Sequence, residues 1–315
     1  MEYGDKHILV LGAGASGIGA SWVLAQVGAH VVLNDYKPVT LPADEEKRLV
    51  SAGVDIITGR QDESLLDGVD RIVISPGISL DIPIVKAAQD RGIDVVSEVE
   101  LAYEVSKSPI VAVTGTNGKT TTTTLLTKVL EGSGKPVRVG GNIGDSLSEV
   151  AYSMPAGGFL VAELSSYQLE TIKHFRPIGA IMLNITPDHL ARHKTMENYI
   201  AAKERIFENQ LKSDYLVLNI DDSVVADMEH RAPSHILQIS QKQTVENGAY
   251  YANGQCYVVE NNVATAVIGD EDIHIPGSHN IENILTVIAL TYALGVPVVE
   301  IHRIINEFHG VEHRL

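Results

Sequence analysis

The chain has 315 residues, of which 44% are hydrophobic and 20% charged, so it is long enough for two domains with separate cores and is not disordered by default. Its 24 lysines and arginines against 40 aspartates and glutamates give a net charge of −16, which excludes a broad basic surface for nucleic acid. Such an acidic chain binds phosphorylated ligands only where helix N-termini, backbone amides, single lysines or Mg²⁺ reverse the local field.

One cysteine, Cys256, excludes an intramolecular disulfide and a multi-cysteine zinc site, and we expect it to be a buried structural thiol. The first six residues carry charges of both signs and lead directly into an apolar strand, which leaves no room for a signal peptide. The longest uncharged stretch, residues 283–299, is interrupted by Asn, Thr, Gly and Pro and does not suit a membrane span. We therefore expect a cytoplasmic protein.

From residue 7 to about 105, short Val- and Ile-rich runs alternate with amphipathic stretches, which is typical of a parallel sheet with crossover helices. The predicted strands are 8–11, 31–34, 54–57, 71–74 and 95–96, and the glycines expected to end helices are Gly28, Gly53 and Gly92. Ser97 and Glu100 form a potential capping box for the last helix, which ends near Pro109. We therefore expect residues 1–107 to form a Rossmann-like α/β domain.

A second α/β series begins at residue 110, with predicted strands at 110–113, 159–162, 178–184 and 215–219. Residues 235–275 contain short strands and the turn dipeptides Asn247-Gly248 and Asn253-Gly254, which predict a small antiparallel appendage on the sheet. Helices are expected over 281–294 and 298–308. These elements predict a P-loop-type α/β central domain over residues 108–311, and residues 312–315 are interpreted as the start of a further domain.

The glycine-rich segment Gly12-Ala13-Gly14-Ala15-Ser16-Gly17 follows the first strand and opens a helix, so its backbone amides can approach a diphosphate. Asp35 ends the second strand, 18 residues after Gly17, where a dinucleotide enzyme holds the ribose. The pattern predicts a nucleotide site, and nicotinamide or flavin dinucleotides fit it as well as any nucleoside diphosphate. The alternative is a purely structural tight turn.

A second glycine-rich segment, Val113-Thr114-Gly115-Thr116-Asn117-Gly118-Lys119-Thr120, joins a predicted strand to a predicted helix that ends at Glu131-Gly132. It predicts a phosphate-binding loop in which Lys119 contacts the β- and γ-oxygens and Thr120 completes a Mg²⁺ shell. Val113 stands where such loops usually begin with glycine, and the alternative is a solvated turn with an ordinary lysine. The threonines at 120–124 oppose helix propensity and indicate a functional helix start, although hydroxyls that bond back to the helix would also tolerate them.

Three single residues are candidates for the same centre. Glu163 follows the strand 159–162 and either holds Mg²⁺ at the carboxyl edge of the sheet or caps the next helix. His189 follows Asn184-Ile185-Thr186-Pro187-Asp188 at that edge, and a single histidine is normally just a satisfied polar residue. Lys203 has the sequence context of an ordinary surface lysine on a helix, and only a chemical change such as carbamylation by CO₂ would make it a metal ligand.

The segment Gly277-Ser278-His279-Asn280-Ile281-Glu282-Asn283 begins a predicted helix. Asn280 and Asn283 are three residues apart and share one face of this helix. Their amides either read a nucleobase edge or cap the helix, and the sequence leaves both interpretations open.

As a set, these motifs resemble the Mur ligase family, the ATP-dependent amide ligases that build the peptidoglycan precursor. The phosphate loop at 115–120 is similar to the family's own version, which explains the missing first glycine. The resemblance also rests on the segment 12–17 and on Ser75-Pro76-Gly77-Ile78, Gly141-Asn142-Ile143-Gly144, Glu163-Leu164-Ser165-Ser166-Tyr167-Gln168-Leu169-Glu170 and His313-Arg314-Leu315. It covers essentially the whole chain and is greatest to the members that add D-glutamate.

The resemblance implies that the carboxylate of UDP-N-acetylmuramoyl-L-alanine attacks the γ-phosphate of ATP, and that the amine of D-glutamate then displaces phosphate from the acyl phosphate. It implies ATP and two Mg²⁺ ions as cofactors and a monomer with neither nucleic-acid nor membrane partners. Family members have a third, C-terminal domain with most of the D-glutamate contacts, whereas this chain stops at its threshold. We therefore expect these 315 residues to bind the UDP-substrate but to ligate slowly or not at all.

The resemblance also implies a division of binding between the domains. The UDP-substrate would be held by Gly14, Ala15, Ser16, Asp35, Tyr36, Lys37, Ser75, Pro76, Gly77 and Asn142. ATP would be bound by Gly115, Thr116, Asn117, Gly118, Lys119, Thr120, Thr121, Asn280, Asn283 and Arg314. The metal ligands would be Thr120, Glu163, His189 and Lys203 as a carbamate, and the catalytic set would be Lys119, Glu163, His189 and Lys203.

Three other functions stay open. An NAD-dependent oxidoreductase would use residues 12–35 and leave the second loop incidental. A non-catalytic P-loop switch would need a guanine-specificity element such as Asn-Lys-x-Asp, which the sequence lacks. A Mur ligase that adds a different amino acid would share all the motifs above.

Overall fold

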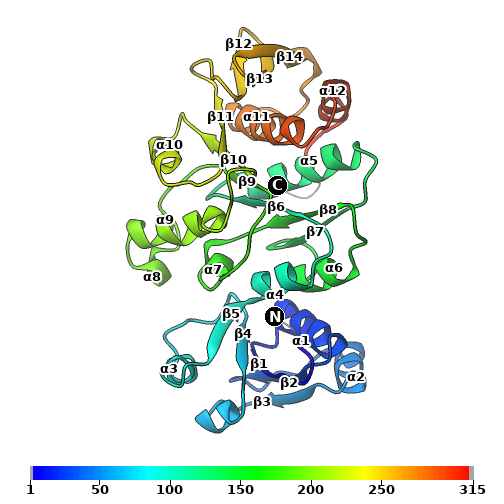
Figure 1. The fold of residues 1–315 in the computed structure, drawn as a ribbon, viewed down its shortest axis with the longest axis vertical. Coiled ribbons are helices and arrows are strands. Elements are labelled where there is room, and N and C mark those ends of the chain that lie inside the picture. The colour runs from blue at the N-terminus through cyan, green and yellow to red at the C-terminus, as the bar shows by residue number, and fades with distance from the viewer. Residues whose placement is uncertain (1–2, 312–315) are drawn as a thin grey trace. The chain divides into compact units, whose positions relative to one another are not determined.

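The structure, a computed structural model, describes residues 3–311 and confirms the predicted α/β fold class. Two units, each with its own sheet, make up the chain (Figure 1). The first unit contains the residues up to Lys107 together with segments 144–154 and 167–175, and the second contains the remainder. The first unit is therefore discontinuous in sequence, because two later segments group with the residues up to Lys107.

The first unit has a five-stranded parallel sheet in the order β3-β2-β1-β4-β5. Its strands are β1 (His7–Leu11), β2 (His30–Asp35), β3 (Asp55–Thr58), β4 (Arg71–Ile74) and β5 (Asp94–Ser97), and its helices are α1 (Ala15–Gln26), α2 (Ala43–Ser51), α3 (Pro83–Asp90), α4 (Glu98–Val105) and α6 (Leu147–Ser153). Ile8 and Val10 pack in one layer with α1, α2 and α4, whereas Leu9 and Leu11 pack in another with α3. The sheet is therefore covered on both faces, which is why its strands are continuously apolar in sequence.

The predicted signals for the ends of the helices agree with the structure, except at the start of α4. Gly28, Gly53 and Gly92 all have left-handed φ angles, as expected of residues that end helices. The capping box predicted from Ser97 and Glu100 is wrong, because the buried hydroxyl of Ser97 has no hydrogen-bond partner. The buried carboxylate of Glu100 instead accepts hydrogen bonds from the backbone N–H groups of residues 173–175. It therefore fastens a distant segment and does not cap its own helix.

The second unit has a nine-stranded sheet in the order β14-β13-β12-β11-β10-β9-β6-β8-β7. Its strands are β6 (Ile110–Thr114), β7 (Val137–Gly141), β8 (Phe159–Glu163), β9 (Gly179–Met182), β10 (Tyr215–Asn219), β11 (His235–Ser240), β12 (Gly248–Ala252), β13 (Gln255–Glu260) and β14 (Val263–Gly269). The main core lies between this sheet and α5 (Lys119–Glu131), α11 (Ser278–Ala293) and α12 (Val298–Asn306). The shorter helices of this unit are α8 (Leu190–His193), α9 (Met196–Glu204) and α10 (Ser223–Asp227), whereas α7 (Ser166–Leu169) begins at its edge and continues into the segment 167–175 of the first unit.

Antiparallel pairing begins later than the sequence indicated. β11 runs parallel to both β10 and β12, and within residues 3–311 the antiparallel pairs are β12–β13 and β13–β14. Asn253-Gly254 makes the expected β12–β13 turn, but Gly248 starts a strand, where an added Cβ would lie 2.0 Å from the carbonyl oxygen of Gln238. This glycine therefore allows a close strand approach and does not form a hairpin turn.

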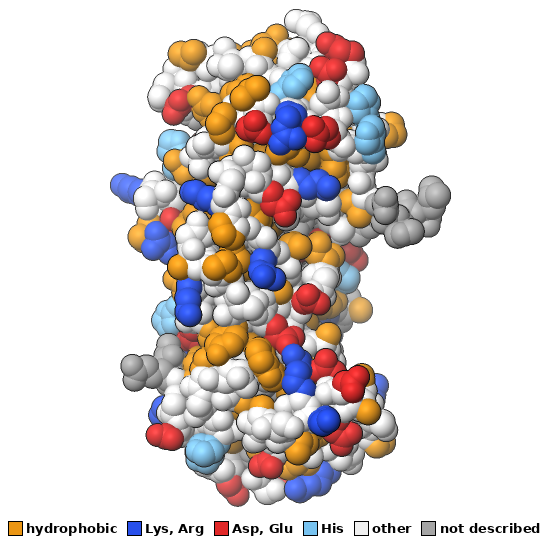
Figure 2. Space-filling model, turned by 90° about the vertical axis from the view of Figure 1, so that its right-hand side faces the viewer, with side chains coloured by type: hydrophobic (Ala, Val, Ile, Leu, Met, Phe, Trp, Pro, Cys, Tyr) orange, Lys and Arg blue, Asp and Glu red, His pale blue; other side chains and the backbone are white. Residues whose placement is uncertain are grey.

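Cys256 lies on β13 and is completely buried, which confirms the prediction of a structural thiol. Burial raises the pKa of its thiol to about 12. On the face shown in Figure 2, acidic and basic side chains are interspersed, so the excess negative charge does not form a single block there. Among residues 3–311, no helix combines the length and apolar character that a membrane crossing requires.

Candidate active site

The predicted phosphate loop lies between the end of β6 at Thr114 and the start of α5 at Lys119, as the sequence indicated. Gly115 and Gly118 have φ angles of +148° and +84°, which other residues adopt only with strain. A Cβ on Gly115 would lie 2.8 Å from Cβ of Leu183, and one on Gly118 would lie 2.6 Å from Oδ1 of Asn283. Both glycines are therefore required by close contacts as well as by backbone conformation.

The side chains of the loop and of the first turns of α5 bond to nearby carbonyl groups. Lys119 Nζ donates to the carbonyl oxygens of Gly115 at 3.0 Å and Thr116 at 2.9 Å. In the threonine run, the hydroxyl of Thr124 donates to the carbonyl oxygen of Thr120 at 2.8 Å. Back-bonding therefore accounts for Thr124, whereas the hydroxyls of Thr122 and Thr123 are buried without a hydrogen-bond partner.

The segment after β9 is fastened to the phosphate loop. Thr116 N–H donates to the carbonyl oxygen of Asn184, and Asn117 N–H donates to the Asn184 side chain. The hydroxyl of Thr116 lies 3.0 Å from that of Tyr199 and accepts a hydrogen bond from the N–H of Thr186. The chain that leads to His189 thus lies directly against the loop.

Glu163 is the last residue of β8 and is only 1% exposed. Its Oε1 accepts a hydrogen bond from Asn142 Nδ2 at 2.9 Å, whereas its Oε2 is buried without a hydrogen-bond partner. An unsatisfied buried carboxylate oxygen is unfavourable unless a cation or donor approaches it. This arrangement fits a hard cation such as Mg²⁺ better than a structural role.

His189 precedes α8 with a left-handed φ of 55°. Its Nε2 lies 3.4 Å from Oδ2 of Asp188, and its ring stands edge-on to Tyr199 with 6.4 Å between ring centres. Over the described range 3–311, there is no group of three or more His, Cys, Asp or Glu side chains arranged to hold a metal. A metal site built on Glu163 and His189 therefore needs ligands of other kinds, such as hydroxyl, phosphate, water or carbamate oxygens.

Lys203, expected to be a surface lysine, is instead 2% exposed on α9, so that expectation is wrong. Its Nζ donates to the carbonyl oxygen of Gly115 at 2.8 Å and to Oγ1 of Thr114 at 3.3 Å. Burial, reinforced by the positive charge of Lys119, lowers its pKa to about 7, and Asp188 opposes this shift. The sequence signal for burial was the helical spacing of Tyr199, Lys203 and Ile206, since both flanking residues are buried.

Asn280 and Asn283 share one face of α11, as predicted. Asn283 Nδ2 donates to Oδ1 of Asn280 at 3.2 Å, and Asn280 Nδ2 donates to the carbonyl oxygen of Pro276 at 2.7 Å. Asn283 is 3% exposed and reaches Gly118 of the phosphate loop. Arg314, the remaining residue predicted to bind ATP, lies outside the described residues, as do all of residues 312–315.

In the first unit, Asp35 connects the predicted UDP-binding segments. Its Oδ2 accepts a hydrogen bond from the N–H of Ala13 at 3.0 Å, and its Oδ1 accepts one from the N–H of Lys37 at 2.9 Å. Ser75 Oγ donates to the carbonyl oxygen of Gly12 at 3.3 Å. A cavity of about 590 Å³ opens beside these segments, lined by Asp35, Tyr36, Lys37, Gln61, Gly77, Ile78, Ser79, Ile82, Pro83 and Ile84.

Sequence reasoning missed Glu98, which is the first residue of α4 and is 2% exposed. Its carboxylate accepts hydrogen bonds from the hydroxyls of Ser16, Ser146 and Ser148 and from the N–H of Ser148. The hydroxyl of Ser16 is thus committed to Glu98, which leaves the backbone of that turn to contact a diphosphate. Nothing in the sequence separated Glu98 from the acidic residues that commonly begin helices.

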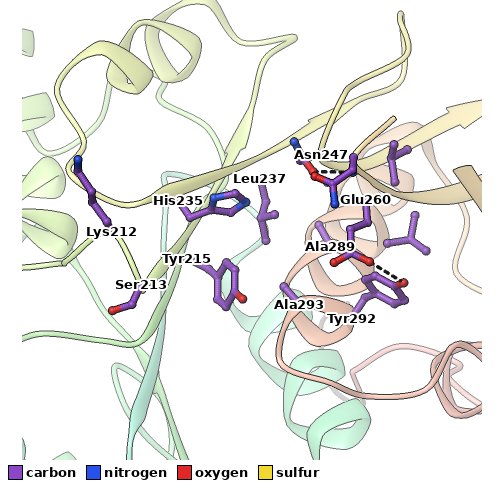
Figure 3. Close-up of a pocket in the computed structure, with 14 residues that line it drawn as sticks. Lys212, Ser213, Tyr215, His235, Leu237, Asn247, Glu260, Ala289, Tyr292 and Ala293 are labelled. Carbon is purple, nitrogen blue, oxygen red and sulfur yellow. Dashed lines mark hydrogen bonds between the residues drawn. The ribbon is translucent and has the colours of Figure 1, made fainter. Parts of the chain in front are cut away.

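A further cavity of about 340 Å³ in the second unit contains none of the predicted site residues (Figure 3). Tyr215 and His235, the first residues of β10 and β11, lie there edge to face, and Tyr292 donates to Glu260. The cavity is at the amino ends of these strands, whereas the phosphate loop follows the carboxyl end of β6. It is therefore separate from the candidate active site.

Comparison with known proteins matches both halves of the chain to one family. Residues 6–97 match the Mur ligase MurD-like N-terminal domain, and residues 113–291 match the Mur ligase middle domain. The UDP-N-acetylmuramoylalanine--D-glutamate ligases of Caldanaerobacter subterraneus subsp. tengcongensis and Halalkalibacterium halodurans are 45% and 41% identical to the chain. The alignments cover 100% of this chain and 69% of each relative.

Solved structures show the same fold. The UDP-N-acetylmuramate:L-alanyl-gamma-D-glutamyl-meso-diaminopimelate ligase of Neisseria meningitides has a TM-score of 0.65 at 22% identity, over 98% of this chain and 100% of that one. The UDP-N-acetylmuramate-alanine ligase of Thermotoga maritima has a TM-score of 0.53 at 24% identity, over 97% of this chain and 69% of that one. From the matched domains and the relatives above 40% identity, the chain belongs to the Mur ligase family.

Proposed function

We propose that this protein joins D-glutamate to UDP-N-acetylmuramoyl-L-alanine at the expense of ATP. Membership of the Mur ligase family makes it an ATP-dependent amide ligase of peptidoglycan precursor synthesis, and D-glutamate is the amino acid named in its 45% identical relative. The observation that carries the proposal is the phosphate loop at 115–120. The buried Glu163 pairs in register with Val113, just before the loop, and the buried amine of Lys203 donates to the carbonyl oxygen of Gly115. We also propose a monomer that works in the cytoplasm, where its nucleotide substrates are made.

The proposed reaction passes through an acyl phosphate. An oxygen of the L-alanine carboxylate forms a bond to the γ-phosphorus of ATP, and the bond to the bridging oxygen of ADP breaks. The amine of D-glutamate then forms the amide bond to the acyl carbon, phosphate leaves, and the amine loses a proton. Lys119, at the start of α5, would bind the β- and γ-phosphate oxygens, and the backbone amides of the loop and first helical turn would hold them in place.

The residues present fit Mg²⁺ as the companion of ATP. Glu163 would supply its unpaired Oε2, Thr120 a hydroxyl, and His189 a ring nitrogen for a second ion. Bound Mg²⁺ offsets the repulsion between anionic reactants and stabilises charge that develops during phosphoryl transfer. Asn142, through its hydrogen bond to Glu163 Oε1, would orient the carboxylate so that Oε2 faces the ion.

We further propose that Lys203 is carbamylated. Its pKa of about 7 leaves much of the amine neutral near pH 7, and the neutral amine is the form that attacks CO₂. The nitrogen forms a bond to carbon, one proton is released, and the product is an anionic carbamate that can hold Mg²⁺. In ¹³C-bicarbonate, the wild-type protein should give a carbamate carbon resonance that Lys203→Met lacks. A resonance of equal intensity in both proteins would contradict this assignment.

In the first unit, the 590 Å³ cavity beside Asp35, Tyr36 and Lys37 is the proposed uridine site. The glycine-rich loop would hold the diphosphate with its backbone amides at the start of α1. This predicts that Asp35→Ala weakens UDP-substrate binding by releasing the N–H groups of Ala13 and Lys37 from their shared partner.

Calorimetry with UDP-N-acetylmuramoyl-L-alanine, Mg-ATP and NAD⁺ tests the proposal. We expect the first two ligands to bind and NAD⁺ to give no heat, and we expect Lys119→Ala to lose ATP binding while it keeps the UDP-substrate. Binding of NAD⁺ in place of the UDP-substrate would favour the oxidoreductase. Because the chain spans 69% of the length of its relatives, binding is the first readout. ADP release, which we expect to be slow or absent with these 315 residues, is then compared for D-glutamate, L-alanine and meso-diaminopimelate, and a preference for one of them separates this activity from that of other Mur ligases.

A further inference from the structure

The amide of Asn184 holds both backbone groups of one residue in the phosphate loop. Its Oδ1 accepts the N–H of Asn117 at 2.8 Å, and its Nδ2 donates to the carbonyl oxygen of Asn117 at 3.1 Å. If the amide were rotated by about 180°, its NH₂ group would face the N–H of Asn117 and its oxygen would face the carbonyl oxygen of Asn117. Only one orientation of the amide therefore forms both hydrogen bonds. Asn184 therefore acts as a two-point clamp on the backbone at the tip of the loop.

The surrounding contacts show why the clamp lies at this position. Leu183 N–H donates to the carbonyl oxygen of Thr114, and Thr116 N–H donates to that of Asn184, so β6–β9 pairing continues into the loop. Gly115 permits this approach, because a Cβ there would lie 3.3 Å from the Asn184 nitrogen as well as 2.8 Å from Leu183 Cβ. The loop consequently rests on residues 183–184, and Asn184 holds Asn117, which is three residues beyond the end of β6.

The clamp also determines which amides can serve a ligand. Because Asn117 N–H is committed to Asn184, phosphate must be bound by the amides that follow it, at the start of α5. On the other side, Lys203 holds the carbonyl oxygen of Gly115. A carbamate at Lys203 would have a single N–H to donate, whereas the amine donates to both Thr114 and Gly115. In the modified protein, the loop would therefore depend more on the two hydrogen bonds from Asn184.

We propose that Asn184 is a positioning residue of the phosphate loop, and that ATP affinity depends on its amide acting through the backbone of Asn117. This inference rests on the proposed function, because it assumes that the loop binds ATP. The two hydrogen bonds are of ordinary strength, so their loss should weaken ATP binding roughly 5- to 100-fold. Binding of the UDP-substrate, which the proposal assigns to the first unit, should not change.

The test compares Asn184→Ala, Asn184→Asp and the control Asn306→Ala, which removes a similar amide at the end of α12. Calorimetry should show weaker Mg-ATP binding for both Asn184 variants, with UDP-N-acetylmuramoyl-L-alanine affinity equal to that of the wild type. Asn184→Asp keeps an acceptor for Asn117 N–H but loses the donor and adds negative charge near the polyphosphate. It preserves side-chain size, so it keeps the test decisive where the alanine variant fails to fold.

Hydrogen exchange of a peptide spanning residues 114–118 supplies a second readout, measured without nucleotide. Exchange should be faster in Asn184→Ala than in the wild type, and Asn306→Ala should match the wild type. The inference would be overturned if both Asn184 variants bound ATP within twofold of the wild type, or if exchange in Asn184→Ala were unchanged. The proposed function would still stand in that case, provided that Lys119→Ala abolishes ATP binding. Failure of the wild type to bind ATP would overturn the proposed function and this inference together.

Discussion

Glu100→Gln tests the finding that a helix residue of the first unit fastens a segment more than 70 positions away. Glu100 is completely buried, and its carboxylate accepts N–H groups from Lys173 at 2.7 Å, His174 at 2.8 Å and Phe175 at 3.1 Å. Glutamine has the same shape but replaces one acceptor oxygen with an NH₂ donor. The substitution therefore removes acceptor capacity without leaving a cavity.

The cost follows from the three hydrogen bonds. One Glu100 oxygen serves Lys173 and Phe175, and the glutamine oxygen can keep these two in weaker, uncharged form. The NH₂ group then faces the N–H of His174, and a backbone donor without a partner costs about 1–3 kcal/mol. With the lost charge assistance, we expect the free energy of unfolding to fall by about 3 kcal/mol. At a urea dependence of about 2 kcal/mol per molar, the unfolding midpoint should fall by about 1.5 M.

Urea unfolding followed by tryptophan fluorescence reports on the first unit, which contains Glu100 and residues 173–175. Trp22, the sole tryptophan, lies on α1 and contacts the ring of Tyr152 edge to face at 5.7 Å. Glu46→Gln, an exposed acid on α2, is the matched control and should change stability by less than about 0.5 kcal/mol. A midpoint for Glu100→Gln within about 0.3 M of the control, a fifth of the expected shift, would refute the reasoning.

Three other predictions concern the second unit. The pKa of Lys203 falls from 10.5 to about 7 on folding, so the unfolded chain binds more protons between these values and stability rises with pH. In bicarbonate-free urea titrations, wild type should gain about 2 kcal/mol relative to Lys203→Met between pH 7 and pH 9, and parallel profiles would exclude this. Gly118→Ala places a side chain at a φ of +84° against Asn283, so it should cost at least about 1–2 kcal/mol of stability and weaken ATP binding, which urea titration and calorimetry measure. An unchanged midpoint would show that the loop relaxes freely. Because burial raises the pKa of Cys256 to about 12, its thiol should resist a disulfide reagent at pH 8 in the native protein and react in urea, whereas rapid native reaction would contradict its burial.

Local features of the sequence predicted most of the secondary structure and the phosphate loop. β10 at 215–219 and the end of α5 at Glu131 coincide with the predicted bounds, because apolar runs and helix-ending glycines are encoded by neighbouring residues. The loop at 115–120 was equally accessible, since its glycines, lysine and threonine are contiguous. The roles of its residues in binding and catalysis stay predictions.

What the sequence determined by itself was therefore most of the strands, the two α/β series and the positions of the chemical motifs, whereas β7 and the bounds of the helices α6 to α10 were not predicted. Tertiary structure alone decided the partners of the buried charges. Glu100 and Glu98 look like ordinary first-turn acids, and Lys203 resembles a surface lysine, yet each is buried with partners at least 48 positions away. The physical reason is that a buried charge is tolerated only where distant backbone or hydroxyl groups converge on it, and that convergence arises from packing of whole elements rather than from local sequence.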